Sequence, residues 1–213
     1  MKTDELVMLL ATGEDSVQRH AAARRYAAAT LVGVVAAGLL MLGLLGVRPD
    51  LADAVRLPMF WAKVGYVAAL AGAGLLAVSR LSRPGARLDR VLPALVLPVV
   101  AMWALAAFVL ADAEPGERMG LWLGATWAVC PFLIAILSAP MFVATAWAMH
   151  GLAPTRLPLA GAAAGLLSGA VGALVYCLHC PEMTAPFIGT WYLLGMLIPA
   201  AAGALLARRV LRW

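Results

Sequence analysis

The sequence has little charge, few reactive side chains and no recognisable enzymatic motif. Only 13% of its 213 residues are charged, whereas 64% are hydrophobic and the mean hydropathy is +0.92. Soluble globular domains carry about 25% charged residues, so this composition excludes a soluble domain. Nothing in the sequence matches a four-cysteine zinc site, and although three cysteines with one histidine could form a zinc site, their spacing is only a weak signal for one. We therefore expect a protein that is not an enzyme, with no catalytic residues.

A cleavable signal peptide is also missing, because about 25 polar or mixed residues precede the first long apolar run. Long unbroken apolar runs exclude a transmembrane β-barrel. A hydrocarbon core roughly 30 Å thick is crossed by about 20 apolar residues in a helix, and six runs reach that length. The fold class predicted is all-α, a polytopic membrane bundle of six transmembrane helices. Their expected ranges are 26–47, 57–78, 91–111, 119–149, 157–178 and 185–206.

The positive charges indicate how such a bundle is oriented. With both termini in the cytoplasm, the inner segments hold twelve of the sixteen Lys and Arg residues. The outer loops then hold three, which are Arg48, Arg56 and Arg118, and Lys63 lies inside the second run. Because basic residues accumulate in cytoplasmic loops, this bias predicts an N-in, C-in topology. The net charge of +5 is explained by topology and implies no nucleic acid partner.

The same topology places most of the chemically reactive residues outside the membrane. The fifth run ends near Leu178 on the outer side, so the stretch from Cys177 to Glu182 lies at the outer surface. The fourth run has 31 residues, which is roughly 46 Å as a helix and exceeds what a bilayer needs. Pro131 leaves the Trp127 carbonyl without its helical partner, so we expect a break there and a span over 131–149. Cys130 then lies at the outer boundary, level with Cys180.

Two thiols near one surface can form a disulfide or share a metal ion. Cys177 lies three residues before Cys180, beside His179, and Glu182 follows closely. The residues alone leave three interpretations open. The first is a disulfide, and the second is a metal ion such as zinc, cadmium or copper at Cys130, Cys180 and His179. The third is that the cysteines are only small apolar side chains, as is common in membrane helices.

Lys63 is the polar residue that stands out within the apolar runs. It is about one turn inside the outer end of the second run. Its stem could extend to the lipid headgroups. Alternatively, it could pair with an outer acid such as Glu182 or Asp112.

Residues 1–25 are the only stretch long enough to hold a soluble partner. Residues 4–11 predict a short helix with Leu6, Leu9 and Leu10 on one side, closed by Gly13. A second helix is expected to start near Asp15 and to continue into the first span. Such an apolar stripe lies on a membrane or docks into a groove of a partner, and the residues alone do not choose between these.

Strings spread over nearly the whole chain resemble the NrsF-like family of anti-sigma factors. They are MKTDELVMLLATG, GVRPDLADAV, LPMFWAK, RPGAR, ATWAVCP, GLAPTR, LHCPEMTAPF and WYLLGMLIP. The resemblance implies a multi-pass protein of the bacterial inner membrane that holds an extracytoplasmic-function sigma factor inactive. Release is implied on heavy-metal or oxidative stress, sensed by Cys130 and Cys180, whereas Cys177 is not required by the family pattern.

The resemblance also implies two parts, a sigma-binding segment over 1–25 and a six-helix sensor domain over 26–213. Partners would be the sigma factor and the lipid bilayer, without nucleic acid or a small-molecule substrate. The candidate partner-binding residues are Asp4, Glu5, Leu6, Leu9, Leu10, Arg24 and Arg25.

Two further functions remain as alternatives. A membrane thiol oxidoreductase needs a redox pair and a shuttle pair, and only Cys177 and Cys180 have the spacing of such a pair. A metal-binding or transport protein needs ligands through the depth of the membrane. None stands out between the outer cysteines and His150. A purely structural membrane subunit is also compatible with the sequence.

Overall fold

The computed structural model describes residues 3–12, 21–83, 85, 87–150, 152 and 154–210, and every regular element in them is helical. This confirms the all-α prediction for the described part of the chain. The long helices are α2 (Ala21–Leu44), α4 (Pro58–Leu81), α5 (Val91–Asp112), α7 (Cys130–His150), α8 (Leu157–Tyr176) and α10 (Leu193–Val210). The short ones are α1 (Thr3–Thr12), α3 (Leu51–Ala54), α6 (Arg118–Leu123) and α9 (Ala185–Phe187). A π-helical turn, η1 (Ile188–Tyr192), joins α9 to α10.

Six of the described helices are long and apolar enough to cross a membrane, counting Ala185–Val210 as one. Five of them match their predicted runs to within a few residues. The fourth run divides as expected, because α6 is separate and α7 begins only at Cys130. Pro131 lies in the first turn of α7, where its missing N–H costs no helical hydrogen bond.

The described N-terminal part agrees with the predicted short helix, since α1 covers Thr3–Thr12. Gly13 and Asp15, at which this helix was expected to end and the next to begin, lie outside the described residues. Helix α2 includes Arg24 and Arg25, so the helix continues across the predicted boundary between residues 25 and 26.

Helix α8 is the centre of the bundle, and most of its residues are buried. It packs mainly against α10, α7 and α4. Its glycines allow this close packing. A Cβ added at Gly165 would overlap the carbonyl oxygen of Pro199 in α10, and one at Gly161 would overlap that of Gly203. A Cβ at Gly172 would lie 2.8 Å from the Ile134 carbonyl oxygen of α7.

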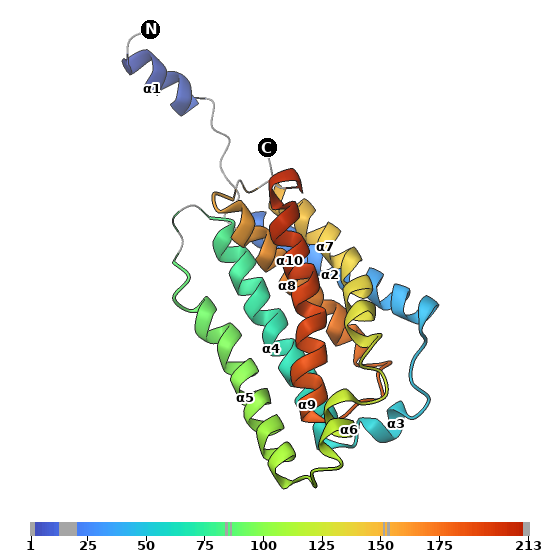
Figure 1. Cartoon of the computed structure of the whole chain (residues 1–213). Helices are drawn as coiled ribbons and strands as arrows, with labels where there is room; N and C mark the ends of the chain where they lie inside the picture. Colours follow the sequence, from blue (N-terminus) through green and yellow to red (C-terminus); the bar gives the residue numbers. More distant parts are fainter. Residues whose placement is uncertain are drawn as a thin grey trace.

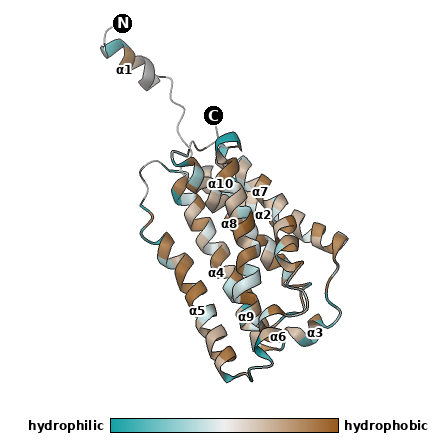
Figure 2. Cartoon of the chain, in the orientation of Figure 1, coloured by the Kyte–Doolittle hydropathy of each residue, from teal (hydrophilic) through white to brown (hydrophobic). Residues whose placement is uncertain are grey.

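The two ends of the bundle differ. We call the end that holds the start of α2 and the end of α10 the terminal end, and the opposite end, with α3, α6 and α9, the thiol end (Figure 1). Hydrophobic residues dominate the long helices, whereas hydrophilic residues gather near the ends (Figure 2). Helix α5 stands at the edge, where it packs against α4 and, at the thiol end, against α9 and η1.

Candidate functional site: a buried thiol cluster

The three cysteines gather at the thiol end. Cys130 is the first residue of α7, and Cys177 and Cys180 follow α8 in the segment that leads to α9. All three are free thiols with 0% of their surface exposed. The thiols of Cys130 and Cys180 are hydrogen-bonding neighbours, so the two residues lie at the same level, as predicted. Cys180 was predicted to lie in a stretch at the outer surface, but its side chain is fully buried.

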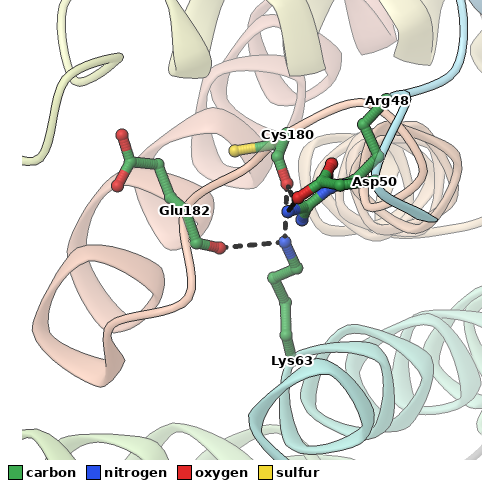
Figure 3. Close-up of polar contacts among 5 residues, drawn as sticks. All are labelled: Arg48, Asp50, Lys63, Cys180 and Glu182. Carbon is green, nitrogen blue, oxygen red and sulfur yellow. Dashed lines mark hydrogen bonds and ion pairs between the residues drawn. The ribbon is translucent and has the colours of Figure 1, made fainter. Parts of the chain in front are cut away.

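Lys63 of α4 binds the main chain of the segment between α8 and α9. Its Nζ donates hydrogen bonds to the backbone carbonyl oxygens of Cys180 at 3.1 Å and of Glu182 at 3.0 Å (Figure 3). Its side chain is 0% exposed, so the expected extension toward lipid headgroups is wrong. The expected pairing with an acid is corrected as well, because Lys63 contacts the main chain of Glu182 and not its carboxylate. A buried ammonium needs such acceptors, since an unpaired charge away from water is costly.

Arg48 binds the same segment from the loop that follows α2. Its Nη1 donates to the Cys180 carbonyl oxygen at 3.2 Å, and its backbone N–H donates to the Leu178 carbonyl at 3.0 Å. Its Nε and Nη2 form a bidentate pair with the Asp50 carboxylate at 2.7 and 2.6 Å. The Arg48 hydrogen bonds hold the pKa of Asp50 below its usual range. Two cations therefore converge on one carbonyl, that of Cys180.

Two tyrosines complete the surroundings of the thiols. Tyr176 ends α8 and Tyr192 lies in the π-helical turn, with ring centroids 5.9 Å apart and both side chains buried. The Tyr192 hydroxyl adjoins the thiols of Cys177 and Cys180, and the Lys63 Nζ lies 5.6 Å from the centre of its ring.

The thiols at this end differ in acidity. The hydrogen bond from Cys130, supported by the Tyr192 hydroxyl and the Lys63 charge, lowers the pKa of Cys180 to about 6. Burial raises the pKa of Cys177 to about 12. Because a thiolate is the reactive form of cysteine, the lower pKa makes the Cys180 thiol more acidic than that of Cys177.

The other two predicted sensing residues point elsewhere. His179 Nδ1 lies 3.0 Å from the Gly46 carbonyl oxygen, and its ring packs against Tyr176. The Glu182 carboxylate accepts hydrogen bonds from the backbone N–H groups of Ala125 and Thr126, at 2.8 and 3.2 Å. Within the described ranges, no three or more His, Cys, Asp or Glu side chains are arranged to hold a metal ion.

Sequence reasoning missed the supporting residues of the cluster. Arg48, Tyr176 and Tyr192 were not singled out, and Lys63 was given the wrong partner. A signal was present for two of them, because Arg48 lies in the string GVRPD and Lys63 in LPMFWAK, both of which carry the family resemblance. The tyrosines lie in mostly apolar helices, where an aromatic residue by itself indicates only packing.

At the terminal end, the predicted partner-binding residues fall into two places. Asp4, Glu5 and Leu6 are exposed on α1, while the side chains of Leu9 and Leu10 lie outside the description. Arg24 and Arg25 stand in the first turns of α2. Arg25 contacts α7, where its Nη2 donates to the Trp147 carbonyl oxygen at 3.0 Å and its guanidinium lies 4.6 Å from the centre of the Trp147 ring.

Comparison with known proteins gives one family and two close relatives. The family model described as negative regulator of sigma F matches residues 10–213. The chain is 60% identical over 213 residues to a probable anti-sigma-F factor NrsF of Azospira oryzae. It is 43% identical over 217 residues to the anti-sigma-F factor NrsF of Caulobacter vibrioides, and each alignment covers 100% of both chains. No solved structure matches.

Proposed function

Because the chain belongs to the NrsF family of negative regulators of sigma F, we propose that it is a membrane-embedded anti-sigma factor. It holds a sigma factor at the cytoplasmic face of the inner membrane and keeps it from RNA polymerase. The observation that carries this proposal is the match over residues 10–213 to a family of regulators, supported by two relatives covered in full. As regulatory proteins, these relatives also speak against the thiol oxidoreductase alternative.

Membrane insertion is supported by the six apolar helices and by the charges at their ends. The terminal end carries Arg24, Arg25, the arginines of the α4–α5 connection, and Arg208 and Arg209. Since basic residues favour the cytoplasmic side, the terminal end faces inward and the thiol end faces the periplasm. Reporter fusions after Arg87 and at the C-terminus should therefore be cytoplasmic, and a fusion after Asp112 should be periplasmic. A periplasmic C-terminus would contradict this orientation.

Sigma binding belongs to the N-terminal segment, residues 1–25. Helix α1 presents exposed Leu6 and Val7 together with the acidic Asp4 and Glu5, which is the composition of a short amphipathic docking helix. Such a short helix is marginal alone in water, so it gains stability on binding.

The thiol cluster is the proposed sensor. On oxidative stress, the Cys180 thiolate is oxidised and the Cys130 thiol reacts with it, giving a Cys130–Cys180 disulfide. Two electrons and the Cys130 thiol proton leave the pair, and hydrogen peroxide accepts them together with one proton from solvent to form two water molecules. A thiophilic cation such as cadmium bridging the two sulfurs would act in the same way, with loss of the thiol protons. Either event draws the start of α7 toward the segment after α8.

Helix α7 connects this sensor to the sigma-binding segment. It packs against α2, where a Cβ added at Gly33 would lie 2.9 Å from the Met141 Cα, and its terminal end bears the contact with Arg25. A shift at Cys130 is therefore transmitted along one helix to the first turns of α2. A tenfold fall in sigma affinity requires about 1.4 kcal/mol, which a disulfide readily supplies.

Co-purification tests the anti-sigma function. Tagged protein is solubilised from membranes with its cognate sigma factor co-expressed, as the full chain and as a variant lacking residues 1–16. The full chain should retain sigma, and the deletion should lose it while remaining in the membrane fraction, because it removes none of the six long helices. If the deletion variant retains sigma fully, the binding surface lies outside residues 1–16, and the inner loop over residues 80–90 is the next segment to test. If the full chain retains none, the proposed function is wrong.

A further inference from the structure

A basic pocket lies at the terminal end, where the α4–α5 connection meets the start of α8. The cavity measures about 370 Å³ and is lined by four arginines, Arg80, Arg83, Arg87 and Arg156, with Asp89 as the single acid. Among the described residues, no hydrogen bond or ion pair engages these four guanidinium groups. Positive charge therefore exceeds negative charge in a concave site, which suits an anion.

An apolar groove continues from this pocket along the helices. It measures about 390 Å³, and residues of α4, α5, α8 and α10 line it. Leu81 and Leu88 line both the basic pocket and the groove, so the two cavities adjoin. Further along, the walls include Leu95 of α5, Leu166 of α8 and Leu197 of α10.

The position of α5 explains the groove. Helix α5 packs against α4 and, at the thiol end, against α9 and η1 (Figure 1). The half of α5 that lies toward the terminal end of the bundle therefore faces α8 and α10 across the groove. On α8 the lining includes the small Ala162 and Ala163, which lie between Leu159 and Leu166 and leave this space unfilled.

We propose that this composite site binds one anionic phospholipid of the inner leaflet. The phosphate of the headgroup lies among Arg80, Arg83, Arg87 and Arg156, and an acyl chain occupies the groove. Guanidinium groups bind phosphate oxygens in a bidentate manner, and basic pockets between transmembrane helices on the cytoplasmic side bind anionic headgroups. The inference rests on the proposed membrane insertion and orientation, but it does not require sigma binding.

The adjacency of the basic pocket and the apolar groove favours a lipid over other anions. A free phosphate would satisfy the arginines and leave the adjoining apolar groove exposed. A lipid satisfies both parts. Its phosphate and its acyl chain belong to one molecule, just as the basic pocket and the apolar groove lie next to each other.

Lipid binding to the purified full chain tests the proposal. The protein, washed free of lipid in mild detergent, is titrated with phosphatidylglycerol or phosphatidylcholine, and bound lipid is counted by native mass spectrometry. The parent should bind phosphatidylglycerol about tenfold more tightly than phosphatidylcholine. The double variant Arg83→Gln/Arg156→Gln should lose this preference. Ala162→Phe, which fills the groove, should weaken phosphatidylglycerol binding while leaving the arginines in place.

Two matched controls make the same kinds of substitution outside the proposed lipid site. Arg208→Gln/Arg209→Gln removes two charges at the same end of the bundle, outside the pocket, and Ala201→Phe adds the same bulk at an exposed position of α10. Both should bind phosphatidylglycerol as the parent does, and all variants should keep the parent's helical circular dichroism and monodisperse elution.

Three outcomes would overturn the proposal. Equal binding of the two lipids by the parent would show that the arginines select no anionic headgroup. Equal losses in test and control variants would show a nonspecific basic surface. Displacement of phosphatidylglycerol by millimolar inorganic phosphate, with no effect of Ala162→Phe, would show a site for free anions. Loss of sigma co-purification by Arg83→Gln/Arg156→Gln with lipid preference unchanged would assign the arginines to the protein partner. A failure of the anti-sigma function would leave the lipid titration unaffected, because no sigma factor is present in it.

Discussion

The Arg25 guanidinium contacts both the main chain and the side chain of Trp147. The guanidinium donates to the Trp147 carbonyl oxygen at 3.0 Å and lies 4.6 Å from the centre of the indole ring. Trp147 is close to the end of α7, and Cys130 is the first residue of the same helix. A single helix of 21 residues, roughly 30 Å long, therefore joins the thiol cluster to the point at which the N-terminal segment enters α2.

Replacing Arg25 should separate sensing from sigma binding. In Arg25→Gln the guanidinium contact with Trp147 is lost, so a shift of α7 no longer reaches the first turns of α2. We expect sigma to co-purify within about twofold of the parent, because the docking helix α1 is unchanged, while induction by cadmium or peroxide falls several-fold. Transcription from a sigma-dependent promoter measures the induction.

Arg208→Gln is the matched control for that experiment, because it removes a charge at the same end of the bundle, from the exposed end of α10. It should respond as the parent does. Full induction in Arg25→Gln would show that the signal passes by another route, such as the contact between α8 and α2.

Lys63 should control the acidity of Cys180. Its ammonium binds the Cys180 carbonyl and contributes to the low pKa of the thiol, which is about 6. A thiolate forms as the pH rises through the pKa, so the parent should show Cys180 thiolate absorbance rising near pH 6 and level above pH 7. In Lys63→Met the favourable charge is lost, the Cys180 pKa rises, and the same absorbance step moves to higher pH.

The measurement is an ultraviolet absorbance titration of the purified protein, with the Cys180→Ser trace subtracted to isolate this thiol. Lys63→Arg keeps the charge and should keep the step near that of the parent. A step that stays in place in Lys63→Met would assign the low pKa of Cys180 to its hydrogen bonds with Cys130 and Tyr192, without a contribution from the Lys63 charge. Helical circular dichroism at each pH confirms that the two uncapped carbonyls have not unfolded the segment.

The sequence predicted the helices well and the site only in part, for physical reasons. Apolar run length locates a helix directly, and Pro131 identified the break that brings Cys130 to the level of Cys180. The partner of Lys63 was not predictable in this way, because its acceptors are main-chain carbonyls, which every residue has. The burial of Cys180 likewise depends on how residues 177–184 fold back, and neighbouring polar residues such as His179 and Glu182 indicated exposure. Their polar groups are instead satisfied by Gly46, Ala125 and Thr126.

Close packing between α8 and α10 should make Gly165 intolerant of a side chain. In Gly165→Ala the added methyl group would overlap the Pro199 carbonyl oxygen, so one backbone must move. Overpacking of this kind costs about 1–3 kcal/mol. The midpoint of unfolding in mixed micelles, followed by circular dichroism, should fall accordingly. Gly72→Ala is the matched control, because a Cβ there has no neighbour within 4 Å, and an equal loss in both variants would contradict close packing as the cause.

Cys130 and Cys180 should act as one unit, and Cys177 should not. The first two thiols are hydrogen-bonding neighbours, whereas Cys177 adjoins the Tyr192 hydroxyl and its pKa is raised to about 12. Cys130→Ser and Cys180→Ser should each abolish most of the response to cadmium or peroxide. The double variant should add nothing further, because the loss of one partner already disables a pair.

Cys177→Ser is the control within the same cluster, and it should respond nearly as the parent does. The readout is again transcription from a sigma-dependent promoter, with and without the inducer, alongside trapping of the disulfide by alkylation and gel mobility. Additive effects of the Cys130 and Cys180 variants would mean that each thiol is sensed separately. An unresponsive Cys177→Ser would instead extend the sensor to all three thiols. Cys177 would then be a third sulfur ligand for a thiophilic cation bound by Cys130 and Cys180.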